Sequence, residues 1–341
     1  MATRSSLIVT ILGLEALLSI ETQHKKPFVQ ADNPNASSLG LNATWTAPMP
    51  STPVSSAYDY IVSNWYSSQG FYGTSNIEFV QDPITANNSS NTVLQVKYPA
   101  GSYAPVATKN GNTGVKGGTE FYTDPYPGVS YNTALLSYDI AFDASFDWVK
   151  GGKLPGLYGG PLGEGCSGGE KANGNNCFSV RLMWRKNGAG EAYAYIPTSE
   201  RLCSTKQVTC NSDYGTSFSR GIIRFKKQQW THLDMFIRLN TGSESNGILQ
   251  VWQDGSLKIN QRHILFRAND SVGISNTMFS TFFGGGSVDY ATPIDTSTYF
   301  KNYVLSVGDT PNPPPDDGST DSSSSASTFT LTISYLSTRI K

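Results

Sequence analysis

The side chains best suited to chemistry are one lysine, one arginine and two tyrosines within a single stretch of the chain. Lys153 lies among glycines and a proline, a composition that lets a polymer backbone approach closely. Arg181 shares one face of an alternating run with Ser179, and Tyr193 and Tyr195 share one face of the next run. A solvated loop lysine and ordinary sheet packing of the tyrosines are the simpler interpretations of the same residues.

This set of groups suits the β-elimination of an acidic polysaccharide. The proton on C5 of a uronate is very weakly acidic, so its removal requires a neutralised carboxylate, a base, and an acid for the leaving O4. Lysine and arginine can stabilise the enolate-like charge. A tyrosine whose pKa is lowered from about 10 by adjacent cations can serve as base or acid near neutrality. We therefore expect neither a metal ion nor a cofactor.

Two other functions remain open at this point. The sequence contains no H-E-x-x-H, P-loop or helix-opening G-x-G-x-x-G motif. A glycoside hydrolase would need two carboxylates about 5–9 Å apart, and no E-x-D-x-x-E strand is present to place them. A non-catalytic protein could instead bind polysaccharide through aromatic residues such as Tyr158 and Trp184.

Short alternating runs between residues 55 and 306 predict an all-β fold. In the run that begins at Leu135, apolar side chains occupy every second position, as in a half-buried strand. Asp254-Gly255 between two such runs predicts a hairpin with a type I′ turn. We expect a β-jelly roll, an antiparallel two-sheet sandwich with a concave substrate cleft. The segment 151–160 is expected to be a loop, and the turn 186–191 to join two neighbouring strands.

The ends of the chain differ in composition from this central region. Residues 1–22 combine Arg4 with an apolar run, which predicts a signal peptide, and residues 23–54 predict an extended lead-in. The lyase-like domain is expected over 55–307. Residues 308–341 are rich in Pro and Ser and predict a linker with a short tail.

The cysteines and the glycosylation sequons indicate a secreted protein. The four cysteines form two close pairs, which predict the disulfides Cys166–Cys177 and Cys203–Cys210. Glycosylation sequons occur as well, and the net charge of −1 argues against nucleic acid as a partner. We expect a monomer that acts on an acidic polysaccharide and does not insert into a membrane. The five sequons begin at Asn35, Asn42, Asn87, Asn88 and Asn269.

These motifs together resemble polysaccharide lyase family 14, and are similar to the fungal glucuronan lyases of the related family 20. The resemblance covers residues 55–306 and rests on Gly-Gly-Lys-Leu-Pro-Gly-Leu at 151–157, Ser-x-Arg at 179–181 and Tyr-x-Tyr at 193–195. The segments 279–286 and 299–302 are also similar. The resemblance implies a β-jelly roll and metal-independent β-elimination of alginate or glucuronan. The active-site residues that it implies are Lys153, Ser179, Arg181, Tyr193 and Tyr195.

Two features depart from the family pattern. The strand at 117–122 carries Glu120 where an amide is common, and a carboxylate there would repel a substrate carboxylate. The cysteine-containing insertion beside the lysine segment could reshape the cleft. The residues expected to bind substrate are Glu120, Tyr122, Tyr158, Arg185 and Lys301.

Overall fold

The computed structural model describes residues 34–308 except 68, 86–90 and 110–111. The predicted signal peptide, the first part of the lead-in, the sequons at Asn87 and Asn88 and the tail after Gly308 lie outside the described residues. The later part of the lead-in contains strand β1 (Ala43–Thr46), which pairs with β17 (Thr296–Gly308).

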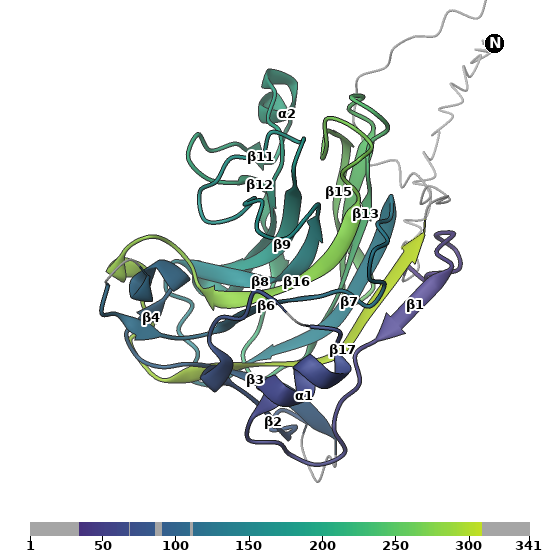
Figure 1. The fold of residues 1–341 in the computed structure, drawn as a ribbon. Helices are drawn as coiled ribbons and strands as arrows, with labels where there is room; N and C mark the ends of the chain where they lie inside the picture. Colours follow the sequence, from purple (N-terminus) through teal and green to yellow (C-terminus); the bar gives the residue numbers. More distant parts are fainter. Residues whose placement is uncertain (1–33, 68, 86–90, 110–111, 309–341) are drawn as a thin grey trace, which may run out of the picture. The chain divides into compact units, whose positions relative to one another are not determined.

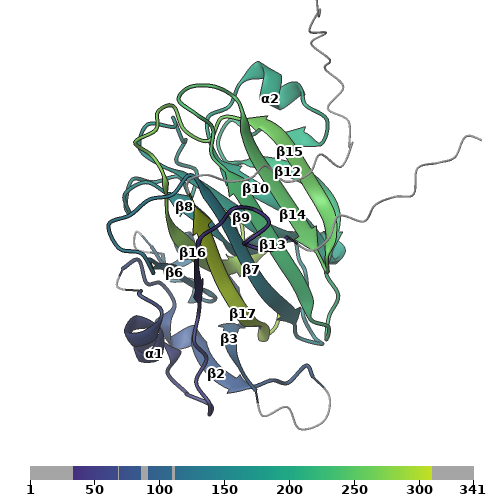
Figure 2. The same ribbon diagram turned by 90° about the vertical axis from the view of Figure 1, so that its right-hand side faces the viewer.

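Two antiparallel sheets form the fold, which is a β-jelly roll (Figure 1). The eight-stranded sheet A has the order β15-β14-β13-β7-β17-β3-β2, with β1 also paired to β17, and Figure 2 shows its central strands side by side. Its strands are β1 (Ala43–Thr46), β2 (Ile77–Gln81), β3 (Thr92–Tyr98), β7 (Thr133–Phe142), β13 (Thr231–Arg238), β14 (Gly247–Gln253), β15 (Ser256–Ile264) and β17 (Thr296–Gly308).

The seven-stranded sheet B has the order β11-β12-β10-β9-β8-β16-β6. Its strands are β6 (Thr119–Thr123), β8 (Gly151–Gly159), β9 (Phe178–Arg185), β10 (Ala189–Tyr195), β11 (Val208–Thr209), β12 (Thr216–Arg224) and β16 (Ile274–Phe283). A separate parallel pair joins β4 (Ser102–Tyr103) to β5 (Val115–Lys116).

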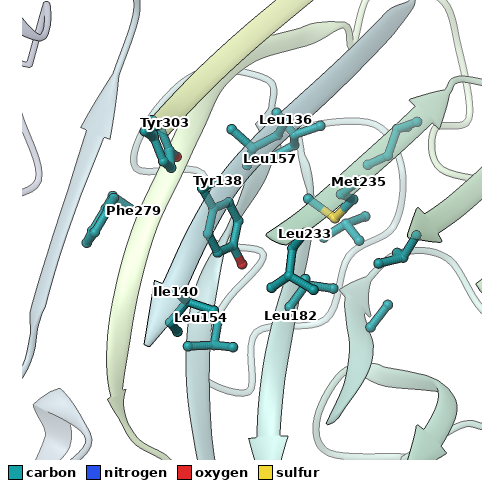
Figure 3. Packing of buried hydrophobic residues seen from close by; sticks show 14 of the residues in the cluster. Leu136, Tyr138, Ile140, Leu154, Leu157, Leu182, Leu233, Met235, Phe279 and Tyr303 are labelled. Atoms are coloured by element: carbon teal, nitrogen blue, oxygen red, sulfur yellow. The ribbon is translucent and has the colours of Figure 1, made fainter. Parts of the chain in front are cut away.

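The hydrophobic core lies between the two sheets, because every second side chain of their strands points inward. Tyr138 and Ile140 on β7 pack in one buried cluster with Leu154 on β8, Leu182 on β9 and Leu233 on β13 (Figure 3). The alternation that predicted a strand from Leu135 therefore marks the core face of β7, as expected.

The predicted hairpin is also confirmed. Strands β14 and β15 pair directly around Asp254 and Gly255, and both turn residues have positive φ, 49° and 77°. Two positive φ angles are what a type I′ turn requires.

The prediction of a loop at 151–160 is wrong, because this segment is the buried strand β8 between β9 and β16. Its glycines leave room for neighbouring chains: a Cβ on Gly152 would lie 2.0 Å from the ring of Trp184, and one on Gly156 would lie 2.0 Å from the carbonyl oxygen of Val180. Close cross-strand packing, and not a loop, accounts for the glycines here.

Both predicted disulfides are present, with Cα–Cα distances of 6.0 Å for Cys166–Cys177 and 5.5 Å for Cys203–Cys210. The helices α1 (Ala57–Asn64) and α2 (Glu200–Ser204) are short, and Cys203 lies in α2. None of the helices in the described residues has the length and apolar character needed to cross a membrane.

Candidate active site

The predicted catalytic residues gather on the face of sheet B that is turned away from sheet A, which we call the cleft face. On β10 the even-numbered residues Ala192 and Ala194 pack in the core between the sheets, so Tyr193 and Tyr195 point to the opposite face. The register pairs Tyr193 with Arg181 on the neighbouring strand β9 and Tyr195 with Ser179. Side chains from three adjacent strands, β8, β9 and β10, are thereby brought together.

Lys153 and the two tyrosines converge, as predicted. The Lys153 ammonium nitrogen lies 3.9 Å from the centre of the Tyr193 ring and donates a hydrogen bond to the sulfur of Met183 at 3.0 Å. The Tyr193 and Tyr195 rings are 5.8 Å apart, edge to face. Three groups that are up to 42 residues apart in sequence thus surround one point on the cleft face.

The surroundings of Lys153 favour its neutral amine. Burial lowers the pKa of Lys153 well below its ordinary value, and the positive charges of Arg181 and Arg185 lower it further. The negative charge of Glu191 opposes this shift without cancelling it. An amine that loses its proton readily can accept one from a substrate.

The tyrosine behaves differently from the prediction. Burial raises the pKa of Tyr193 above its ordinary value, and the neighbouring Tyr195 adds to the increase. Arg185 and Arg181 act in the expected direction, but burial outweighs them. Tyr193 therefore holds its proton firmly, which suits a proton donor better than a base.

Both hydroxyl groups are fixed by backbone amides. The Gly215 N–H donates to the Tyr193 hydroxyl at 2.9 Å, and the Gly169 N–H donates to the Tyr195 hydroxyl at 3.0 Å. Because each oxygen accepts a hydrogen bond, each hydroxyl proton is left for another acceptor.

Arg181 is buried in the floor of the cleft face, with only 1% of its side chain exposed. One of its terminal nitrogens donates to Ser280 at 3.1 Å and lies 3.9 Å from Glu120, and Ser280 donates to the same Glu120 oxygen at 2.7 Å. The strand face that carries Arg181 is therefore closed to solvent at this position. The pairing also balances the negative charge of Glu120, the residue that departs from the family pattern.

The loop closed by Cys166–Cys177 contributes backbone groups to the site. The Ser179 hydroxyl donates to the Cys166 carbonyl at 2.6 Å, and the loop residue Gly169 binds Tyr195 as described above. Tyr158 is buried on the same face and donates to the Pro161 carbonyl at 3.1 Å. The insertion thus forms one wall of the site.

Sequence reasoning missed a second polar group on the cleft face, centred on Glu191. This carboxylate is fully buried and accepts hydrogen bonds from Arg185, from Ser217 at 2.7 Å and from Arg220 at 2.6 Å. Glu191 lies two residues before Tyr193, so the alternation could have placed it on this face. The expected turn at 186–191 concealed it, because β10 already begins at Ala189.

An open cavity of about 430 Å³ lies beside the site, on the side formed by β6 and β16. Tyr122, whose ring lies 5.4 Å from that of Tyr158, lines the cavity together with Asn276 and Pro161. Tyr122 and Tyr158 therefore join the site to a space that could hold further sugar units.

Lys301 does not belong to this group. It lies on β17 of sheet A, where its ammonium pairs with Asp82 at 3.1 Å and lies 4.0 Å from the centre of the Trp230 ring. Its neighbour Phe300 fills the core, so Lys301 points outward from sheet A. The prediction that Lys301 binds substrate in the cleft is therefore corrected.

Within the described part of the chain, no cluster of three or more His, Cys, Asp or Glu side chains is arranged to hold a metal ion. The described groups of the cleft face are one amine, several phenols, and guanidinium groups that are paired with the carboxylates of Glu120 and Glu191.

Comparisons with known proteins identify relatives. The model of the family Polysaccharide lyase 14 matches residues 86–303. The marine PL-14 alginate lyase from Aplysia kurodai is 32% identical, has a TM-score of 0.65, and is matched over 79% of this chain and 99% of that chain. No curated protein matches.

Two more distant solved structures share the fold. Alginate lyase vAL-1 from Chlorella virus is 21% identical with a TM-score of 0.57, and the match covers 74% of this chain and 96% of that chain. A variant of alginate lyase Aly36B in complex with an alginate trisaccharide is 21% identical with a TM-score of 0.58, and the match covers 79% of this chain and 99% of that chain.

Proposed function

The chain belongs to polysaccharide lyase family 14 and is a polysaccharide lyase, and we propose that it cleaves a polyuronate by metal-independent β-elimination at the cleft face. The observation that carries this proposal is the convergence of Lys153 with Tyr193 and Tyr195. An amine with a lowered pKa beside a phenol with a raised pKa provides a base and an acid at one point.

The proposed reaction uses these groups in turn. The neutral Lys153 amine takes the C5 proton, the C5–H electron pair forms the C4–C5 double bond, and the C4–O4 bond breaks. A tyrosine hydroxyl protonates the leaving O4, and the lysine proton later returns to the phenolate. The guanidinium carbon of Arg181 lies 6.0 Å from the centre of the Tyr195 ring. The positive charge of Arg181 stabilises the negative charge that develops on the uronate carboxylate.

Alginate is the first substrate to test, because the relative from Aplysia kurodai is described as an alginate lyase, and glucuronan is the second. Two disulfides and exposed sequons at Asn35 and Asn42 support the proposal that the protein is secreted, since disulfides persist in oxidising compartments.

The cleft carboxylates give little support to a glycoside hydrolase. Glu191 is buried beneath two arginines and a serine, and Glu120 is occupied by Ser280 and Arg181. A glycosidase requires one carboxyl group that donates a proton to the glycosidic oxygen. Every described partner of these two carboxylates is instead a hydrogen-bond donor.

Ultraviolet absorbance during incubation with alginate, glucuronan and pectate separately tests the proposal. A lyase creates a C4–C5 double bond, so absorbance should rise with one of the polyuronates. New reducing ends without that absorbance would indicate a hydrolase, and binding without any product would indicate a non-catalytic carbohydrate-binding protein. The rise should persist in the presence of a chelator if no metal ion takes part.

A further inference from the structure

The Glu191 cluster has the composition of a carboxylate-binding site. It contains two guanidinium groups, from Arg185 and Arg220, and one carboxylate that is fully buried. One positive charge therefore remains uncompensated within the cluster. A buried carboxylate that holds two arginines fixes their orientation before any ligand arrives.

A bulge in β12 places Arg220 over this cluster. The strand pairs Ile223 with Gly190 and Phe218 with Ala192, so the residues between Phe218 and Ile223 bulge from the ladder. Ser219, at the start of the bulge, has a positive φ of 51°. A regular strand would send Ser217 and Arg220 to opposite faces, whereas the bulge lets both reach Glu191.

The arginines keep donors available for a ligand. Arg220 binds Glu191 through its Nε atom, and 54% of its side chain is exposed. Its two terminal nitrogens have no partner among the described residues. Arg185 is 18% exposed, and its guanidinium carbon lies 5.9 Å from the centre of the Tyr193 ring. The cluster thus adjoins the reaction point without coinciding with it.

We propose that Arg185 and Arg220, positioned by Glu191, bind the carboxylate of a uronate that neighbours the one losing its proton. This inference rests on the proposed function and narrows its substrate class. The enzyme should favour polymers in which consecutive sugars carry carboxylates over polymers in which uronates alternate with neutral sugars. Glu191 is a positioning residue in this arrangement.

The test compares Arg220→Gln with Arg224→Gln, an exposed arginine on the same strand outside the cluster. On a continuous polyuronate, Arg220→Gln should raise KM about tenfold, the effect of losing one hydrogen bond to a charged group, while kcat changes little. The dependence of KM on salt should also weaken. On an alternating polymer, Arg220→Gln should match wild type. Arg224→Gln should behave as wild type on both polymers.

Equal KM values for Arg220→Gln and wild type on the continuous polyuronate would overturn the second carboxylate site. Calorimetry measures binding of the same polymer without turnover, so it distinguishes a failure of the carboxylate site from a failure of the proposed lyase reaction. If no unsaturated product forms but Arg220→Gln still weakens binding about tenfold relative to Arg224→Gln, the carboxylate site stands while the lyase mechanism falls. Unaltered melting temperatures would show that both variants fold.

Discussion

At the scale of single residues, the site separates a proton acceptor from proton donors by burial and charge. Lys153 is surrounded by two arginines, an aromatic ring and a thioether, and this environment disfavours its ammonium form. The same burial disfavours the phenolate of Tyr193. One physical cause, the loss of water around both groups, therefore gives the amine and the phenol opposite roles.

Removing either the base or the proton donor should slow turnover strongly without unfolding the protein. Lys153→Ala removes the base, and Tyr195→Phe removes a hydroxyl held by the Gly169 amide. Each should reduce kcat by about 10²–10⁴, the usual cost of losing a proton-transfer or charge-stabilising group. Lys226→Ala and Tyr58→Phe, at exposed residues that belong to no strand of sheet B, are the controls. Activity within a few fold of wild type in Lys153→Ala would exclude the lysine as base.

Replacing Arg181 should lower stability as well as turnover, because its buried guanidinium donates to Ser280 and lies beside Glu120. Arg181→Lys replaces a planar group with a point charge, which cannot reach Ser280 and Glu120 in the same geometry. We expect both kcat and the melting temperature to fall, with the loss of activity at least about tenfold. Arg224→Lys serves as the exposed control. A variant that keeps full activity and full stability would reduce Arg181 to a dispensable charge.

The sequence alone predicted which side chains could react, but not how each of them is buried and paired. Alternation along β9 and β10 correctly placed Arg181 with the tyrosines, because strand periodicity needs no tertiary information. The burial of Arg181 depends on Ser280 and Glu120 from β16 and β6, more than 60 residues away in either direction. Lys301 was misplaced for the converse reason, since a motif match does not specify which sheet a strand joins.

At the scale of elements, the strands that were predicted best are those with one polar and one apolar face. Strand β8 lacks that signal, because glycines take the positions where Trp184 and the β9 backbone approach it. The bulge in β12 is equally hidden, since it depends on the pairing with β10. Both features help to form the active site. The alternation of polar and apolar residues was therefore least informative for the strands that carry the site.

The loop closed by Cys166–Cys177 gives an element-scale prediction. Its backbone holds the hydroxyls of Tyr195 and Ser179, whereas Cys203–Cys210 staples α2 to β11 at the sheet edge. Replacing Cys166 and Cys177 by alanine should lower kcat about 10–10²-fold through misplaced groups. Replacing the other pair should lower the melting temperature while kcat, assayed well below it, stays within about twofold. Equal kcat values for the two double variants would show that the first loop takes no part in catalysis.

At the scale of the whole fold, the two sheets divide chemistry and stability between them. Sheet B presents the amine, phenols and arginines of the cleft face. Sheet A carries an outer network in which His232 of β13 contacts Asp139 of β7 at 2.6 Å and Asp234 at 3.3 Å. Asn302 of β17 donates to Asp139 at 2.7 Å, so the network joins three central strands. No residue of this network lies on the sheet that holds the predicted catalytic groups.

That separation predicts a pH effect on stability that leaves catalysis untouched. Hydrogen bonds to Asp139 and then to Asp234 raise the pKa of His232 from 6.5 to about 10, against the opposing effect of burial. Because the folded-state pKa is raised, the stabilisation is fully present below about pH 6.5 and is lost as pH rises through about 10. His232→Asn should therefore lower the melting temperature at pH 6, and the difference from wild type should shrink toward pH 10. The kcat of His232→Asn at pH 7, measured well below its melting temperature, should equal that of wild type. A stability difference that is constant from pH 6 to pH 10 would show that His232 contributes by packing alone, and a specific loss of kcat would show that the two sheets are coupled.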